Sequence, residues 1–180
     1  MIGRFQKKII TELRNMNTKR FTVSDYFKQV SVIHYALLMG VLFFIALSVF
    51  LTASDYISPV EEDIQTLVLV GCSALFLGGM VIVFAITQRK LKELKSNVFG
   101  LLSKLTHYRA ILILRGALCE LIAFAITLVY LLTAIHFVLI IAVLSFAVLF
   151  FVSPTKERLI RELQLDSKEI EVIYNPDAEL

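Results

Sequence analysis

Long apolar blocks alternate with polar segments along this chain, and most of the charges lie in the gaps. The blocks cover residues 30–53, 64–87, 110–134 and 136–152. A helix needs roughly 20 apolar residues to cross the hydrocarbon core of a bilayer, and only the fourth block is clearly shorter than that. The pattern therefore predicts an all-α integral membrane protein whose domain of residues 30–153 is a four-helix bundle.

Polar segments with helical periodicity flank this domain and interrupt it. Residues 1–29 contain a basic amphipathic stretch, 2–16, which we expect to lie on the membrane surface or to pack on the protein's own cytoplasmic parts. Between the second and third blocks, leucines recur at helical spacing. We expect the second and third spans to continue as helices and to meet near residues 96–100, whereas "TAIH" predicts a tight turn between the third and fourth.

Residues 154–180 are predicted to form an acidic tail of short helices. Ser153 suits an N-cap with Pro154 at the first helical position, and Asp166 with Glu169 fits a capping box for a second helix. The final "YNPDAEL" predicts an acidic, loose end. The tail carries seven acids and four bases, so it could dock on the basic central connection, on the basic N-terminal segment or on a partner.

The charge distribution predicts an orientation. Bases dominate residues 1–29 and the central connection, whereas the loop "SDYISPVEED" has four acids and no base. Positively charged flanks stay in the cytoplasm. We therefore expect both termini and the central connection to be cytoplasmic in a multi-pass protein of a bacterial inner membrane.

The composition is typical of a membrane protein, and the residue motifs limit the kinds of site that the chain could form. Hydrophobic residues make up 58% of the 180 and the net charge is +3, with a mean hydropathy of +0.79. Soluble proteins are nearer 45–50% apolar. Cys72 and Cys119 fall inside predicted spans, where they are expected to pack rather than to pair or bind metal. No hydrolase, nucleotide-binding or metal motif is present, so the sequence predicts no enzyme activity, no cofactor, no metal and no nucleic-acid partner.

Glu120 is the polar residue that the pattern does not explain. It lies inside the third block, where a charged side chain costs about 2.5–3.5 kcal/mol and commonly marks function or internal pairing. Three roles stay open: a hydrogen-bonded acid that fixes helix register, an acid that handles protons or ions, and a ligand contact. Arg115 is poorly placed to pair with it on one helix and is expected to extend to the lipid headgroups.

The polar side chains that could meet Glu120 from the spans are His34, Tyr35, Ser73, Thr87 and Thr127. Small residues predict where helices approach closely. The positions expected to pack in this way are Gly71, Ala74, Gly78 and Gly116.

The first and third blocks resemble each other. An offset of 81 residues aligns "IHYALLMGVLFFIALSVFLTA" with "LRGALCELIAFAITLVYLLTA", with eight of 21 positions identical. Both copies would enter from the same side, which suggests an internal repeat of two parallel helical hairpins. Met39 would then occupy the place of Glu120.

Two resemblances to known families add to this picture. The stretches "IHYALLMGVLFF", "THYRAILILRGALCELIAF", "SPTKERLIRELQLDSKEIEVI" and "NPDAEL" resemble an uncharacterised family of small four-span membrane proteins of Bacteroidota, which implies topology and location but no activity. Locally, "LILRGALCELIAFAITL" is similar to the carboxylate helix of the rotary ATPase proteolipid subunit, which implies an ion-binding role for Glu120. The second block lacks that subunit's regular glycine ladder, and the connection is longer.

These observations lead to three hypotheses for function. The first is a non-enzymatic scaffold or accessory subunit that pairs with a membrane protein or with a second copy of itself. The second is a small proton- or ion-coupled carrier that uses Glu120. The third is a protein that binds membrane lipids.

Overall fold

A computed structural model describes residues 22–54, 62–96 and 100–180, and these residues form helices and no named strand. The predicted surface helix of residues 2–16 and most of the acidic loop lie outside the described residues. Within them the helices are α2 (Val23–Ala53), α3 (Glu62–Ser96), α4 (Leu101–Thr133), α5 (His136–Phe151), α6 (Lys156–Leu163) and α7 (Ser167–Tyr174).

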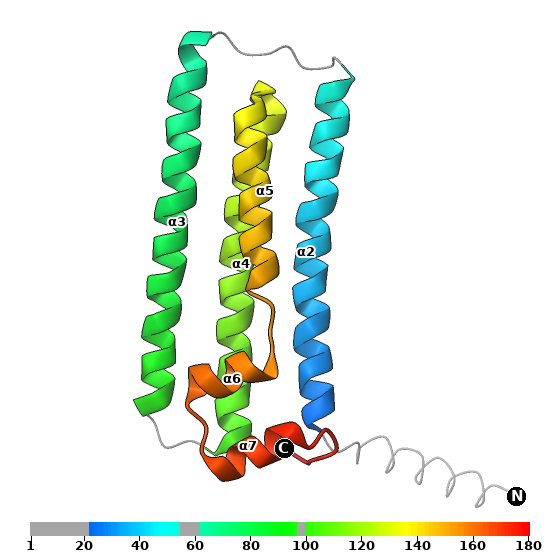
Figure 1. The fold of residues 1–180 in the computed structure, drawn as a ribbon, viewed down its shortest axis with the longest axis vertical. Helices are drawn as coiled ribbons and strands as arrows, with labels where there is room; N and C mark the ends of the chain where they lie inside the picture. The colour runs from blue at the N-terminus through cyan, green and yellow to red at the C-terminus, as the bar shows by residue number, and fades with distance from the viewer. Residues whose placement is uncertain (1–21, 55–61, 97–99) are drawn as a thin grey trace, which may run out of the picture.

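Helix α4 is the centre of the arrangement, because α2, α3 and α5 all pack against it. Figure 1 shows α2 and α3 on opposite sides of the α4–α5 pair. The turn between α4 and α5 is as short as "TAIH" predicts. Ala134 ends α4 in the left-handed conformation, with its amide donating to the Tyr130 carbonyl, and Ile135 precedes α5.

Three of these helices are long and apolar enough to cross a membrane, namely Val23–Ala53, Ile64–Ser96 and Leu101–Thr133. They suggest a membrane protein, as the apolar blocks predict. Helix α5 has 16 residues and bends by 79° into α6, so it adds a fourth candidate only if the two are counted together. As expected, the helices of the second and third blocks extend beyond their apolar parts, with α3 ending at Ser96 and α4 beginning at Leu101.

Two clusters of buried side chains hold the helices together. The first lies among the long helices and includes Val41, Ile126 and Val138. The second lies where the tail meets α2 and α4, and contains Tyr26, Leu105, Tyr108, Leu159 and Ile173 among others. The tail is therefore part of the folded core.

The tail helices begin where side chains cap them, with one correction to the sequence prediction. The N-cap of α6 is Thr155, whose side chain accepts from the Arg158 amide at 3.2 Å, and not Ser153. The sharp bend between α5 and α6 uses residues 153–155, so the helix starts later than expected. The capping box of Asp166 and Glu169 at α7 is confirmed, with the Glu169 amide 2.8 Å from Asp166 Oδ1.

The C-terminal segment is irregular but is hydrogen-bonded to α2, contrary to the loose end that was predicted. The Val23 amide donates to the Ala178 carbonyl at 3.2 Å, and the Ser24 amide donates to the Pro176 carbonyl at 3.1 Å. The first amides of a helix have no acceptor within the helix. The last residues of the chain supply these acceptors for α2, which sequence periodicity does not reveal.

The two halves of the chain differ in their packing. Helix α5 follows α4 directly and packs along it, whereas α3 lies across α4 from α2 (Figure 1). Helix α3 has 35 residues and α5 has 16. The likeness of the first and third blocks therefore does not extend to two equivalent hairpins.

Candidate functional site

Glu120 faces the contact between α4 and α2. Its Oε1 is 3.4 Å from the position that a Cβ would take at Gly40, so the glycine leaves room for the carboxyl group. The side chain is partly exposed. Among the described residues, none forms a hydrogen bond or an ion pair with it. The acid therefore lies at the edge of the α2–α4 interface without a polar partner in that part of the chain.

The five polar side chains expected near Glu120 do not hydrogen-bond to it. Thr87 and Thr127 donate to the carbonyls of Val83 and Ala123 on their own helices, at 2.8 and 2.7 Å. Such bonds are usual for hydroxyls inside helices. Tyr35 is 61% exposed, Ser73 is partly buried on α3, and His34 is buried with its Nε2 lacking a hydrogen-bond partner in the structure.

The expected small-residue contacts divide into two groups. Gly116 lies close to α2, since a Cβ there would be 3.0 Å from Leu37 Cδ1. A Cβ at Gly71 or Gly78 would have nothing within 4 Å among residues 22–54, 62–96 and 100–180, and Ala74 is exposed. We call Gly71, Ala74 and Gly78 the outer face of α3, because they point away from the described part of the chain.

Gly79 lies at the close contact between α3 and α4, although it was not among the small residues expected to pack. A Cβ at Gly79 would lie 2.7 Å from Ile122 Cδ1. Gly79 follows Cys72 by seven residues and precedes Val83 by four, and both of these side chains are buried. This helical spacing was the available signal for its packing role.

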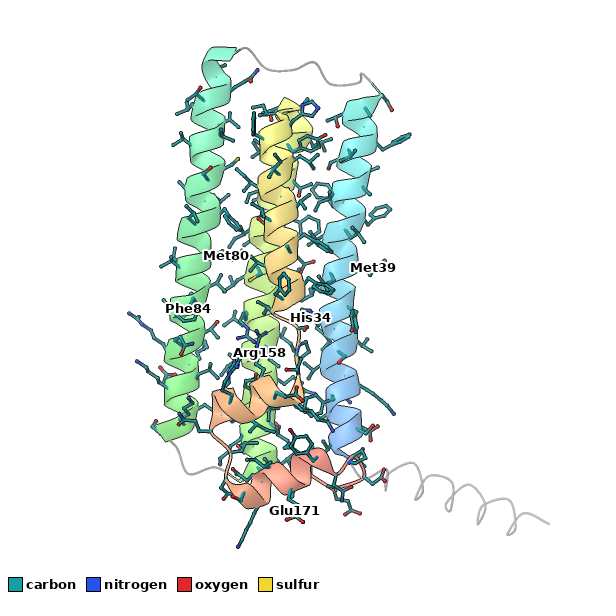
Figure 2. All side chains as sticks on the ribbon, in the orientation of Figure 1. His34, Met39, Met80, Phe84, Arg158 and Glu171 are labelled. Atoms are coloured by element: carbon teal, nitrogen blue, oxygen red, sulfur yellow. The ribbon has the colours of Figure 1, made fainter. Side chains whose placement is uncertain are left out.

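A polar cluster joins the tail to α4. Glu162 of α6 accepts from Arg115 Nη1 at 3.1 Å and from the Tyr108 hydroxyl at 2.8 Å. Arg158 Nε lies 3.8 Å from the same carboxylate. Figure 2 shows Arg158 and His34 near the level at which α5 gives way to α6. We call Tyr108, Arg115, Arg158 and Glu162 the α4–tail cluster.

The prediction that Arg115 extends to the lipid headgroups is wrong. Its side chain is 11% exposed and lies under α6. A guanidinium that is mostly withdrawn from water needs a carboxylate nearby, and the tail supplies Glu162. Its Nε and Nη2 atoms have no hydrogen-bond partner in the structure.

Of the places left open for docking of the acidic tail, the described residues show a contact with the basic central segment. Lys104 Nζ lies 2.6 Å from Glu169 Oε1 of α7. The sequence indicated the two charged surfaces but not which acids would pair. The roles of Glu162 and Tyr108 depend on the 79° angle between α5 and α6. The residues Ser153 and Pro154 indicate a break between two helices but not this angle.

No family model, curated protein or solved structure matches this chain. Within residues 22–54, 62–96 and 100–180, no group of three His, Cys, Asp or Glu side chains could hold a metal ion. Within the described part of the chain, the features that can indicate function are the outer face of α3, Glu120, which has no polar partner there, and the surfaces around α4.

Proposed function

We propose that this chain is a four-span, non-enzymatic scaffold or accessory subunit, and that the outer face of α3 packs against a helix of another membrane protein. The proposal rests on one observation, which is that this face of α3 points away from the rest of the described chain. Gly71 and Gly78 have open space beside them, whereas Gly79 and Gly116 are filled by contacts within the chain.

Small residues matter for helix association in a bilayer. Lipid tails are as apolar as leucine, so apolar burial alone does not drive two helices together there. Close approach of backbones at glycine and alanine gives the van der Waals contact that favours association. In the most apolar stretch of α3, only 11% of the residues are buried by the described part of the chain, so many of its side chains can face lipid or a partner.

The orientation that we propose follows from the basic segments. Both termini and the central connection are cytoplasmic, and the membrane is the inner membrane of a bacterium. Support comes from the bases at Arg89, Lys90, Lys92 and Lys95 near the end of α3, because positive flanks stay in the cytoplasm. In this orientation the tail covers the cytoplasmic end of α4.

Site-specific photo-crosslinking in native membranes tests the scaffold function. A photoreactive residue replaces Ala74 on the outer face of α3, and the matched control replaces the exposed Ala117 on α4. We expect a discrete heavier product from position 74 only, and loss of that product when Gly78→Leu is added. Products of equal yield from both positions, or none from position 74, would contradict the proposed role of this face.

A second candidate is a proton- or ion-coupled carrier that uses Glu120. It is favoured by the partly exposed carboxyl group beside Gly40, which has no hydrogen bond or ion pair among the described residues. Proton flux into vesicles that contain the purified protein tests it. The carrier should lose flux in Glu120→Gln while it remains folded, whereas a scaffold should show no flux in either form.

A further inference from the structure

The guanidinium group of Arg115 uses only part of its hydrogen-bonding capacity within the described part of the chain. Its Nη1 donates to Glu162 at 3.1 Å, whereas its Nε and Nη2 are buried and have no hydrogen-bond partner there. The N–H groups of Nε and Nη2 point in parallel from one edge of the planar guanidinium group, and such an edge binds an anion through two hydrogen bonds. The edge of Arg115 that Glu162 does not use is therefore suited to an anion.

The charges of the α4–tail cluster do not cancel. Arg115 and Arg158 carry two positive charges and Glu162 carries a single negative charge, so the cluster keeps one positive charge. The Tyr108 hydroxyl donates to Glu162 and is therefore neutral. A charge withdrawn from water is costly unless an opposite charge compensates it, and the Arg115 side chain is mostly buried. One monovalent anion would complete the balance.

His34 lies at the same depth as Arg115, on the helix that packs beside α4. Leu37 of α2 approaches Gly116 of α4, so His34, one helical turn before Leu37, lies close to the turn that includes Arg115. Arg115 and Arg158 both interact electrostatically with the His34 ring, and Figure 2 shows His34 and Arg158 at similar heights. The His34 side chain is 7% exposed, and its Nε2 is buried without a hydrogen-bond partner among the described residues. A second unpartnered nitrogen therefore lies near the Arg115 guanidinium group.

The space around these groups limits the size of the ligand. A cavity of about 10 Å³ lies beside His34, between α2, α4 and the bend that precedes α6, and this is close to the smallest space that holds one water molecule. Pro154 lines this cavity at the bend, four residues before Arg158. The Nε and Nη2 atoms of Arg115 are themselves shielded from water. A lipid phosphate group is too large for this space, whereas a chloride ion is only slightly larger than a water molecule.

We propose that the α4–tail cluster binds one small monovalent anion, of the size of chloride, at the Nε–Nη2 edge of Arg115. His34 donates to the same ion from Nε2, and Arg158 adds its positive charge from the tail. The ion joins α2, α4 and α6 where the tail folds back on the long helices, so anion binding and docking of the tail stabilise each other. This site goes beyond the scaffold function, and it does not depend on the outer face of α3 or on Glu120.

Thermal unfolding of the full-length, delipidated protein in an uncharged detergent tests this site. The midpoint is measured in potassium chloride and in potassium gluconate at the same ionic strength, because gluconate is too large for the cavity. Relative to gluconate, we expect the midpoint to rise by about 3–5 °C for each tenfold increase in chloride once the site is mostly occupied. No rise relative to gluconate would overturn the proposal. A rise with added phosphatidylglycerol but not with chloride would also overturn it, because a lipid headgroup would then be the ligand.

Two variants and a control locate the ion. Arg115→Lys keeps the positive charge opposite Glu162 but removes the edge with two donors, so the rise with chloride should be lost. His34→Phe removes the second donor and should weaken chloride binding about 3–10-fold, as expected for the loss of one hydrogen bond. Arg109→Lys is the matched control and should keep the rise, because Arg109 is on the same helix and hydrogen-bonds to Gln29 outside the cluster. An equal rise in Arg115→Lys and in the control would contradict the site. Unchanged chloride affinity in His34→Phe would do so even if Arg115→Lys fails to fold.

Discussion

At the scale of single residues, Glu162 is a side chain that several polar contacts hold in place outside the apolar core. It accepts from both Arg115 and Tyr108, with 18% of its side chain exposed. Hydrogen bonds to charged groups contribute about 1.5–3 kcal/mol each when they are protected from water. Removing the carboxylate would leave the mostly buried Arg115 without its counter-charge, so the loss of stability should exceed that of one neutral hydrogen bond.

We predict that Glu162→Gln lowers the free energy of unfolding by about 2–3 kcal/mol. Thermal unfolding in mild detergent, followed by near-ultraviolet absorbance, measures the effect. Glu157→Gln is the control on the same helix, because Glu157 is exposed and should change stability by less than about 0.5 kcal/mol. Equal stability of the two variants would show that the α4–tail cluster contributes little to the fold.

At the scale of helices, two adjacent glycines on α3 have opposite environments. A Cβ at Gly79 would meet Ile122 on α4, whereas a Cβ at Gly78 would have none of the described residues within 4 Å. Alanine is favoured over glycine in a helix by about 1 kcal/mol, so the sign of a substitution depends on whether the new methyl group has space. Comparing the stabilities of alanine substitutions at these two positions therefore tests which face of α3 packs within the chain.

We predict that Gly79→Ala is less stable than Gly78→Ala by about 1–3 kcal/mol, because Ile122 must move to admit the new methyl group. Gly78→Ala should match or exceed the unmodified protein. Unfolding of both variants in the same detergent gives the comparison. If the order were reversed, α3 would have to be rotated relative to the described packing.

The positions of the helices were predictable because the length of each apolar block and the periodicity of the apolar residues both depend on the local sequence. The apolar blocks, the tight turn before His136 and the capping box at Asp166 all follow from local residue types. The direction in which α3 presents its glycines was not predictable, since Gly78 and Gly79 are adjacent and both small. The contacts of Arg115 with Glu162, and of Val23 with Ala178, join residues far apart in the chain, so no local pattern encodes them.

At the scale of the whole molecule, the tail and α2 close one end of the helical arrangement, as Figure 1 shows. Val23 and Ser24 of α2 donate to the final segment, and Lys104 of α4 pairs with Glu169 of α7. The charged and hydrogen-bonded contacts between distant elements are concentrated at this end. In the proposed orientation this end is the cytoplasmic one.

Cysteine labelling tests the orientation. We predict that Lys168→Cys, exposed on α7, reacts with a membrane-impermeant maleimide only after the inner membrane is opened. Ser54→Cys, exposed at the end of α2, should react in cells whose outer membrane alone is permeable. The native Cys72 and Cys119 are buried and serve as the background in the unmodified protein. The opposite labelling of positions 54 and 168 would invert the proposed topology.

The central claim is that this chain works by holding another membrane protein, and the most direct test is native mass analysis of the complex extracted gently from its own membrane. The account predicts a species heavier than the 20.4 kDa chain that contains a different protein and is lost in Gly78→Leu but kept in Ala117→Leu. A species built only from this chain and lipid, unchanged by Gly78→Leu, would contradict the scaffold function.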